Sequence, residues 1–433
     1  MKVTIAGTGY VGLGSAAVLA HIGHDVICVD VDTAKIEQLR QGKCPIFEQG
    51  LPELLHAGAE NLSFTTDYKS AYQNADIIIM AVGTPEKADG SANLSYVFKV
   101  AEQIAESVAD FCVVAVKSTV PIGTNDRIEE HLKKHLIQDI PVTVVSNPEF
   151  LSQGTAVHDM LYAHRIIVGT NDEQAREKMR RLYGPLGQPI IFTDRRSAEM
   201  IKYASNDFLA LKISYVNEIA NLCELLGANI EDVTRGMGLD PRIGPKFLQA
   251  GIGYGGSCFP KDTKALHWLS SYHDYEIKTV KAAIEVNESQ KLRLVKKARR
   301  YYNSFVGLTV AVLGLTFKPG TDDLREAPSL DNVPILLDDG ASIRAWDPCG
   351  TERFRRKFPK GIHYCNSPQE ALEDADLCFI FTEWSQVKNL RPEDFLRMKR
   401  PVILDGRNCF DPEKMAEYPL IYDSIGRRTV HNL

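Results

Sequence analysis

A glycine-rich turn near the start of the chain constrains the possible folds more than any other feature of the sequence. The turn, GTGYVG at residues 7–12, follows an apolar run at residues 3–6 and precedes a stretch with helical spacing. A second apolar run, residues 26–29, leads to Asp30, 18 residues beyond Gly12. Strand, glycine turn, helix and strand in this order, with an acidic residue after the second strand, predict a dinucleotide-binding βαβ unit.

Each part of the turn has a physical role in this prediction. Gly7 permits the tight turn, Gly9 lets the backbone approach a pyrophosphate, and Gly12 lets helix and strand pack closely. The helix N-terminus offers unpaired N–H groups to the phosphates. Asp30 can accept hydrogen bonds from a ribose diol and would repel a 2′-phosphate, so NAD is favoured over NADP. The alternative is a turn that binds nothing, with Asp30 an ordinary turn residue.

The rest of the first third continues to alternate short apolar runs with helical stretches. The runs at residues 77–82, 112–116, 142–145 and 165–168 are rich in Val and Ile and bounded by turn-forming or polar residues. Continuous apolar strands separated by helices are typical of a parallel sheet buried on both faces. We therefore predict a doubly wound α/β domain.

The middle of the chain has a different pattern. Residues 198–226 form one long helical stretch that ends at Gly227. Its apolar residues nearly encircle the axis, which indicates burial between domains or in a subunit interface. A Gly/Pro-rich loop follows at residues 236–260, and further helix is expected at residues 262–302.

The last third returns to alternation, with strands expected at residues 309–313, 342–346, 377–381 and 402–404. It also echoes the start of the chain, because Asp30 lies seven residues after Gly23 and Asp347 lies seven residues after Gly340. A chain of 433 residues has room for about three domains. We place a Rossmann domain at residues 1–197, a central helical domain at residues 198–302 and a second Rossmann-like domain at residues 303–433.

Composition and charge exclude several classes of protein. The chain is 44% hydrophobic and 24% charged, as expected for a globular protein, and no apolar run reaches the ~18 residues of a membrane-spanning helix. Its net charge of −6, without a basic run, argues against nucleic acid and membrane surfaces as partners. Nine cysteines without a C-x-x-C pair indicate reduced thiols, no metal site and a cytoplasmic location. Glycines interrupt the N-terminal apolar run, so no signal peptide is expected.

Polar side chains stand where predicted strands end. Thr84, Thr119 and Glu149 follow three of the runs named above. Ligands bind at the carboxyl ends of strands in such sheets, so the hydroxyls could contact a cofactor or a reaction water, and the carboxylate could bind substrate or move a proton. Alternatively, both threonines could belong to helix-capping turns, and the glutamate could be a first-turn helix acid.

The most unusual stretch is FLQAGIGYGGSCFPKD, residues 247–262. Its four glycines are costly in folding entropy, which is understandable if the backbone must lie close to a ligand. Cys258 follows them, near Lys261 and directly before a helix expected to begin near Asp262. A helix N-terminus and an ammonium both lower the pKa of a thiol, so we predict that Cys258 is a nucleophile; the alternative is an inert buried cysteine.

Two further polar features accompany this loop. Lys202 and Asn206 share one face of the long helix, where they could stabilise an oxyanion near Cys258 or make a hydrogen bond between domains. In the last third, FKPGTDDLR at residues 317–325 occupies the position of the first glycine turn but lacks its spacing. We expect Lys318 to contact the phosphate or sugar of a different nucleotide.

A NAD site combined with a reactive cysteine predicts two successive oxidations. An alcohol becomes an aldehyde by hydride transfer, the thiolate adds to the aldehyde, and a second hydride transfer leaves a thioester that water hydrolyses to an acid. A second nucleotide fold indicates that the substrate carries a nucleotide. A single-oxidation hydroxyacid dehydrogenase, which would not need Cys258, and a non-catalytic nucleotide-sugar binding protein are the alternatives.

The motifs GTGYVG, STVPIGT, NPEFL, the cysteine loop and FKPGTDDLR occur in the order seen in the nucleotide-sugar dehydrogenases, and the chain resembles this family from residue 1 to about residue 410. The resemblance implies NAD-dependent oxidation of UDP-glucose to UDP-glucuronate by a homodimer or higher homo-oligomer. It also implies dimerisation through residues 198–302 and UDP-sugar binding by residues 303–433. A UDP-N-acetylhexosamine or GDP-mannose is the alternative substrate. Ser152-Gln153 and Gln49 depart from the family pattern, which leaves the fine sugar contacts open.

The resemblance also implies roles for individual residues. Cys258 would be the nucleophile, with Lys202 and Asn206 stabilising the oxyanion, Asp262 and Thr119 managing water and protons, and Glu149 assisting thioester hydrolysis. NAD would contact Gly7, Gly9, Tyr10, Val11, Gly12, Asp30, Lys35, Thr84, Thr119, Lys261 and Arg325. The UDP-sugar would contact Glu149, Phe150, Leu151, Lys202, Asn206, Phe247, Leu248, Gln249, Ala250, Gly251, Tyr254, Gly255 and Lys318, with Arg242 reaching it from a partner subunit.

Overall fold

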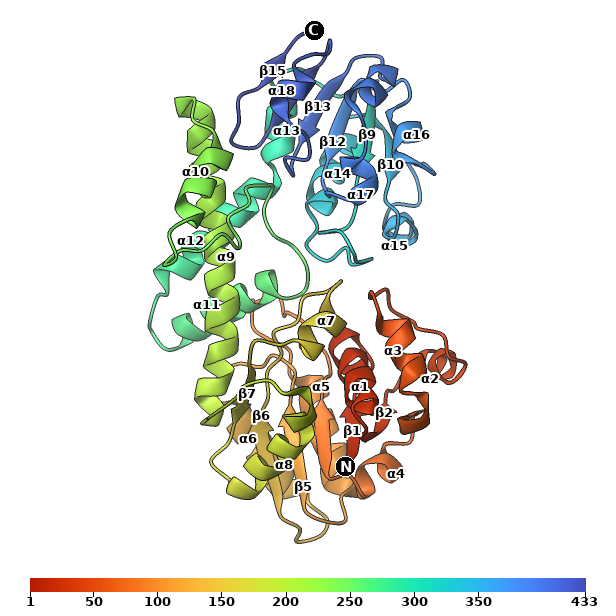
Figure 1. The fold of residues 1–433 in the computed structure, drawn as a ribbon, viewed down its shortest axis with the longest axis vertical. Helices are drawn as coiled ribbons and strands as arrows, with labels where there is room; N and C mark the ends of the chain where they lie inside the picture. Colours follow the sequence, from red (N-terminus) through yellow and green to blue (C-terminus); the bar gives the residue numbers. More distant parts are fainter. The chain divides into compact units, whose positions relative to one another are not determined.

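Two separate β-sheets, each flanked by helices, organise the chain (Figure 1). The computed structural model describes residues 1–433, which divide into a first unit, Met1–Ser205, and a second unit, Asn206–Leu433. The boundary falls inside one 32-residue helix, α9 (Arg195–Leu226). The predicted fold class, with two Rossmann-like sheets and a helical region containing one long helix, is confirmed.

The first sheet has the strand order β3-β2-β1-β4-β5-β6-β7-β8. Its strands are β1 (Lys2–Ala6), β2 (Asp25–Val29), β3 (Leu62–Thr65), β4 (Ile77–Met80), β5 (Cys112–Val116), β6 (Val142–Ser146), β7 (Ile166–Gly169) and β8 (Ile190–Thr193). Neighbouring strands run parallel except β6 and β7, which pair antiparallel. The strand order reverses between β1 and β4, and the carboxyl ends at such a reversal are where ligands bind in open α/β sheets.

Helices cover both faces of the first sheet. They are α1 (Tyr10–His21), α2 (Thr33–Arg40), α3 (Leu51–Ala57), α4 (Tyr68–Gln73), α5 (Ser95–Ser107), α6 (Thr124–His135), α7 (Ala156–Leu161) and α8 (Glu173–Tyr183), with short 3-10 turns at Ala59–Asn61 and Gly184–Leu186. Val114 of β5 packs in a core with α5 and α6, whereas its neighbour Val113 packs in a core with α1 and α8. Burial on both faces explains why β4 and β5 are apolar at every position.

The second sheet has the strand order β11-β10-β9-β12-β13-β14-β15. Its strands are β9 (Thr309–Leu313), β10 (Ser342–Trp346), β11 (Ile362–Tyr364), β12 (Leu377–Ile380), β13 (Val402–Asp405), β14 (Ile421–Ser424) and β15 (Val430–His431). Only β14 and β15 pair antiparallel. The central order β10-β9-β12 repeats β2-β1-β4 of the first sheet. Asp30 and Asp347, the residues of the sequence echo, therefore follow equivalent strands, β2 and β10.

The remaining helices of the second unit follow α9 along the chain. They are α10 (Ile230–Gly238), α11 (Phe259–Tyr272), α12 (Lys278–Lys291), α13 (Arg293–Ala298), α14 (Pro328–Asp338), α15 (Thr351–Lys357), α16 (Pro368–Leu372), α17 (Ser385–Lys388) and α18 (Pro412–Met415), with a 3-10 turn at Pro392–Arg397. None of the helices, α9 included, is both long and apolar enough to cross a membrane.

Five strands escaped the sequence prediction for two physical reasons. The strands β3, β8, β11 and β15 are partly exposed, and none has an apolar run longer than three residues. β14 is fully buried, but it carries the polar Asp423 and Ser424. Asp423 is accommodated there because it pairs with buried Lys297 at 2.6 Å.

Helix boundaries differ from the prediction in the middle of the chain. The long helix begins at Arg195 rather than residue 198, and the stretch predicted as helical, residues 262–302, contains α11, α12 and α13. The predicted loop from residue 236 to 260 is shorter, since α10 continues to Gly238 and α11 begins at Phe259. The strands predicted at residues 77–82 and 377–381 end at Met80 and Ile380.

Candidate active site

The glycine turn connects β1 to α1, and each of its glycines suits its position for a different structural reason. Gly7 has a φ of 99°, and a Cβ there would lie 2.8 Å from the Ala81 carbonyl oxygen. A Cβ on Gly12 would lie 2.0 Å from the Gly7 carbonyl oxygen, so neither position can carry a side chain. At Gly9, the N-cap of α1, an added Cβ would meet nothing within 4 Å. This open approach to a helix N-terminus, where Tyr10 and Val11 form the first turn, fits a pyrophosphate.

Asp30 stands directly after β2 and is held by the glycine turn itself. It accepts hydrogen bonds from the Thr8 amide at 2.8 Å and the Thr8 hydroxyl at 2.6 Å, and Lys35 lies 3.6 Å away. Partial burial works to raise the pKa of Asp30, but the hydrogen bonds from Thr8 and Asp32 and the charge of Lys35 outweigh it and lower the pKa. Asp30 is therefore an anion beside the turn, as a ribose acceptor must be.

The equivalent acid of the second half is engaged differently. Both oxygens of Asp347 accept hydrogen bonds from the chain, one from the Leu315 amide at 2.7 Å and the Trp384 indole at 3.0 Å, the other from the Gly350 amide at 2.6 Å. Asp347 is only 4% exposed. Its hydrogen bonds fix the loop after β9, so it is a structural residue.

The hydroxyl residues at the strand ends are not helix caps. Thr84 is buried and donates to the Thr119 carbonyl oxygen at 2.9 Å, which joins the loops after β4 and β5. α5 and α6 begin at Ser95 and Thr124, beyond both residues. Hence the capping alternative is wrong. A cavity of about 10 Å³, room for about one water molecule, is lined by Ser118, Thr119, Val120, Ser146, Pro148, Glu199 and Lys202.

Glu149 and Lys202 form a buried ion pair in the first unit. Their charged atoms lie 3.1 Å apart, and their side chains are 6% and 3% exposed. The Lys202 ammonium also lies 5.4 Å from the centre of the Phe150 ring, against which Arg165 stacks at 4.2 Å. Glu149 further accepts from the Leu151 amide. Since α7 begins only at Ala156, the first-turn alternative for Glu149 is wrong.

In the second unit, Cys258 lies beside a second polar cluster. It is the N-cap of α11 and is half-buried, with its sulfur 3.8 Å from the Ser257 hydroxyl. Within the first turn of α11, Asp262 pairs with Lys261 and accepts from the Asn206 amide at 2.7 Å. Asp262 is 1% exposed. The thiol thus stands at a helix N-terminus, the position that favours a thiolate.

Three amide side chains hold the cysteine loop, and sequence reasoning missed them. Asn217 of α9 accepts from the Gly251 amide at 2.8 Å. Asn287 of α12 exchanges hydrogen bonds with the Tyr254 backbone at 2.8 and 3.1 Å, and Gln290 donates to the Gly251 carbonyl at 2.7 Å. All three are buried amides on helices, and polar residues inside a predicted apolar face were the available signal.

The loop glycines have a structural reason besides the predicted closeness of the backbone to a ligand. A Cβ on Gly255 would lie 2.3 Å from the Glu326 carbonyl oxygen, and one on Gly256 would lie 2.8 Å from the Phe317 ring. A Cβ on Gly253 would lie 2.7 Å from Asn287. The glycines therefore let the loop pack against its own unit, whatever ligand it also meets. Leu248 is buried, whereas Phe247, with a φ of 64°, and Gln249 are exposed and Ala250 is half-buried.

The other cysteines differ from Cys258 in their surroundings. None of the nine cysteines forms a disulfide. Burial raises the pKa of Cys112 to about 12 and of Cys349 and Cys365 to about 11, and it also raises the pKa of Cys28 and Cys378. Thiols with raised pKa values are poor nucleophiles, which supports a structural role for them.

The basic residues predicted for ligand contact lie at or near the surface. Lys318 is half-buried beside the Phe317 ring, at 5.7 Å from its centre. Arg325 pairs with Asp323 at 2.7 Å and its side chain is 58% exposed. Arg242 pairs with Asp240 at 2.6 Å and is 88% exposed.

Two buried glutamates outside the predicted set position the loops of the first unit. Glu48 accepts from the Gly154 and Ala156 amides, both at 2.8 Å, and so fixes the segment that follows Glu149. Glu199, one turn before Lys202 on α9, accepts from the Gly123 and Asn125 amides at the start of α6. Their partners lie far away in the sequence, so no local pattern could reveal them.

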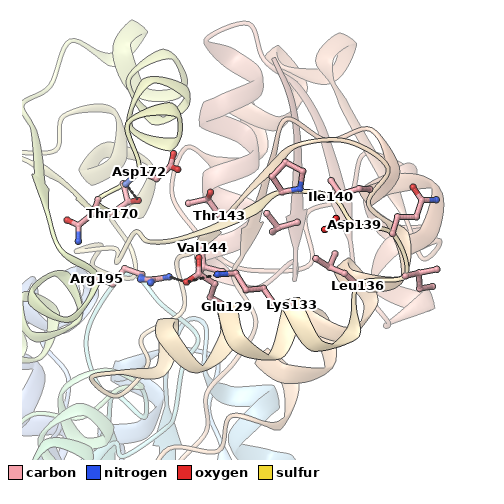
Figure 2. Close-up of a pocket in the computed structure, with 15 residues that line it drawn as sticks. Glu129, Lys133, Leu136, Asp139, Ile140, Thr143, Val144, Thr170, Asp172 and Arg195 are labelled. Carbon is pink, nitrogen blue, oxygen red and sulfur yellow. Dashed lines mark hydrogen bonds and ion pairs between the residues drawn. The ribbon is translucent and has the colours of Figure 1, made fainter.

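A cavity of about 880 Å³ lies at the opposite end of the first sheet, between α6, the start of β6 and the end of β7 (Figure 2). Its charged side chains pair with one another, as Glu129 lies 2.9 Å from Arg195 and 3.7 Å from Lys133. None of the predicted site residues lines it.

Comparison with known proteins agrees with this geometry. The chain matches three consecutive domain models of one family: the NAD binding domain at residues 1–187, the central domain at residues 196–289 and the UDP binding domain at residues 311–412. The chain belongs to the UDP-glucose/GDP-mannose dehydrogenase family.

Relatives within the UDP-glucose/GDP-mannose dehydrogenase family match over nearly the whole chain. It is 45% identical to UDP-glucose 6-dehydrogenase YwqF of Bacillus subtilis and 46% identical to UDP-glucose 6-dehydrogenase of Rhizobium meliloti, covering 99% of this chain and 98% and 100% of theirs. A UDP-glucose dehydrogenase structure from Pyrobaculum islandicum superposes with a TM-score of 0.93 at 35% identity, covering 98% of each chain. The first unit therefore contains the NAD binding domain of this family, and the glycine turn lies within it.

A pair of glycine substitutions tests the NAD site. Gly12→Ala places a methyl group against the Gly7 carbonyl and should lower NADH affinity at least tenfold, because the turn must open. Gly14→Ala is the matched control on the same helix, where a Cβ meets nothing within 4 Å; it should bind normally and gain about 0.5–1 kcal/mol of stability. Fluorescence titration with NADH and thermal unfolding measure both effects. Equal affinity of the two variants would contradict the assignment.

Proposed function

We propose that this protein oxidises the C6 hydroxyl of UDP-glucose to the carboxylate of UDP-glucuronate in two NAD-dependent steps. The observation that carries the proposal is a half-buried cysteine at the N-terminus of α11, beside the Lys261, Asp262 and Asn206 cluster, in a chain with an NAD site. Relatives that are 45–46% identical over the full chain are UDP-glucose 6-dehydrogenases, which supports UDP-glucose as substrate.

NAD supplies the hydride acceptor for both steps. The chain holds it through the glycine turn, the N-terminus of α1 and Asp30, with Lys35, Thr84, Thr119, Lys261 and Arg325 as further proposed contacts. In the first step the substrate hydroxyl loses its proton to a base and C6 loses a hydride, which leaves an aldehyde.

Cys258 carries the second oxidation. Its thiolate adds to the aldehyde carbon, the carbonyl oxygen takes a proton, and a thiohemiacetal forms. Loss of a second hydride and of the hydroxyl proton gives a thioester, and water cleaves it to the carboxylate and the free thiol. The two NADH molecules account for the four electrons removed.

The buried polar pairs supply charge and protons for these steps. We assign Lys202 and Asn206 to stabilising the negative oxygen of the adduct, because each ends in an N–H donor held by a carboxylate partner, Glu149 or Asp262. Glu149 and Asp262 are assigned to activating the hydrolytic water and exchanging protons, with Thr119 assisting.

The substrate contacts follow the same division of the chain. We propose that residues 149–151, residues 247–251, Tyr254, Gly255 and Lys318 hold the UDP-sugar, and that residues 1–197, 198–302 and 303–433 are functional domains for NAD, dimerisation and UDP. The three family matches support this division. Nine cysteines without a disulfide support a cytoplasmic location.

We further propose a homodimer that pairs through α9. Phe208, Tyr215 and Leu222 follow one another at seven-residue intervals on this helix, and their exposed fractions are 62%, 51% and 48%. A seven-residue repeat keeps apolar side chains on one helix face, and a single chain leaves this face exposed. The exposed Arg242, which pairs with Asp240 within one chain, would then reach the sugar of the partner.

The NADH yield per sugar tests the reaction. We expect about two NADH for each UDP-glucose consumed, because the alcohol carbon loses two hydrides. UDP-N-acetylglucosamine and GDP-mannose, run in parallel, should react at least tenfold more slowly. A yield near one would exclude the thioester route, and faster reaction with either competitor would reassign the substrate within the family.

Substitution of the thiol tests the role of Cys258. Cys258→Ser should lower steady-state NADH formation at least about 1000-fold, since the hydroxyl cannot supply a thiolate, and the sugar should stall after the first oxidation. Cys44→Ser, a half-buried thiol elsewhere, should keep wild-type rates. Stopped-flow absorbance and mass spectrometry of the sugar distinguish the outcomes; full turnover by Cys258→Ser would refute the mechanism.

A charge placed on the apolar stripe tests the dimer. Tyr215→Glu should convert the assembly to monomers in light scattering, because each pairing would bury two uncompensated carboxylates. Val306→Glu, at a site 72% exposed and outside α9, is the control and should leave the mass unchanged. A wild-type protein that is already monomeric would overturn the proposal.

A further inference from the structure

One buried acid beside the proposed catalytic cluster has no role in the reaction described above. Asp207 on α9 is 4% exposed, and neither of its carboxylate oxygens has a hydrogen-bond partner. A buried carboxylate without a partner is among the costliest groups that a protein can contain. Such a group persists only if it is neutral or if its cost serves a purpose.

The surroundings of Asp207 contain more negative than positive charge. Its neighbour Asn206 donates to Asp262, which is itself paired with Lys261 in the first turn of α11. Both Lys261 and Asp262 act electrostatically on Asp207. Asp207 and Glu288 of α12 both act electrostatically on the phenol of Tyr254 in the cysteine loop. Lys261 thus acts on two acids, Asp207 and Asp262, and it already forms an ion pair with Asp262.

This charge balance decides the protonation state of Asp207. Burial and then the negative charge of Asp262 raise the pKa of Asp207 to about 8, against a smaller opposing effect of Lys261. At neutral pH Asp207 is therefore a carboxylic acid, and only Asp262 is an anion at this place. The same balance predicts that raising the pH ionises Asp207, which adds a second anion directly after Asn206 in the chain.

We propose that Asp207 is a positioning residue whose neutral form keeps Lys261 and Asn206 on Asp262, and whose deprotonation disrupts this cluster beside Cys258 and stops turnover. The proton leaves to solvent, and the new anion competes with Asp262 for the Lys261 ammonium. Asp207 itself touches no reacting atom in this scheme, and the proposal for turnover rests on the function proposed above.

The pH dependence of turnover tests this role. In the wild type, kcat for UDP-glucose should fall about tenfold per pH unit above pH 8, the slope of one essential proton. Asp207→Asn keeps the shape and the neutral state, so its kcat should not fall in this range. Asp331→Asn, which removes a half-buried acid with a raised pKa on α14, is the matched control and should retain the wild-type fall. Superimposable profiles for wild type and Asp207→Asn would overturn the proposal.

Infrared difference spectra between about pH 6 and about pH 10 test the protonation without any activity. In wild type and in Asp331→Asn, raising the pH should remove a carboxylic-acid carbonyl band. In Asp207→Asn this loss should be smaller. A wild-type spectrum without this difference shows that Asp207 does not titrate in this range and overturns the proposal. If the band titrates but no nucleotide sugar is oxidised, the proposed function fails while the assignment of the proton stands. Asp207→Leu, which also lacks a titrating group, replaces Asp207→Asn if that variant does not fold.

Thermal unfolding gives a second readout of the same proton. The pKa of Asp207 in the folded state is above its unfolded value, so the folded state binds the proton more tightly. The stability from this proton is complete below about pH 4, declines as pH rises toward the folded-state pKa of about 8, and is absent above it. The Tm of wild type relative to Asp207→Asn should therefore decrease between about pH 4 and pH 8. A constant difference in Tm across this range would contradict the raised pKa.

Discussion

The rule that a buried polar group must find a partner controls the organisation of this protein around α9. Glu199, Lys202, Asn206 and Asn217 are all nearly inaccessible on that helix, yet none can be left without a hydrogen bond at acceptable cost. Residues before Asn206 find their partners in the first unit, at the start of α6 and at Glu149. From Asn206 onward the partners lie in the second unit, at Asp262 and in the cysteine loop. The helix is thus the common support of both proposed polar sites.

The cysteine loop shows how a costly backbone is stabilised. Glycines at positions 253, 255 and 256 allow contacts shorter than any side chain would permit, and Asn287 and Gln290 then satisfy the peptide groups that these contacts bury. Arg407 adds hydrogen bonds from its guanidinium to the carbonyls of Gly253 and Phe317. The loop therefore places Cys258, the proposed nucleophile, at the N-terminus of α11, with the preceding backbone held by these hydrogen bonds.

The two sheets repeat one strand order but use the turn after the first strand differently. In the first unit the turn is open above Gly9, and Asp30 stands beside it as an anion. In the second unit Asp347 is nearly inaccessible, and its oxygens accept hydrogen bonds from the loop after β9 and from Trp384. The repeated strand order thus occurs in both the NAD binding domain and the UDP binding domain of the family.

The sequence by itself determined the fold class and the dependence on NAD, and it predicted the glycine turn as the NAD site and Cys258 as the reactive one of nine thiols. Those features depend on local spacing: alternating strands and helices, glycines at fixed intervals, and a thiol directly before a helix. The exposed strands β3 and β11, the polar strand β14 and the partners Glu48 and Glu199 were not predictable, because they depend on contacts between distant segments. The protonation of Asp207 is the clearest case. Nothing in the order of residues says that this acid lies buried beside Asp262, and only the tertiary structure decides it, since desolvation and the charge of a neighbour depend on position in space.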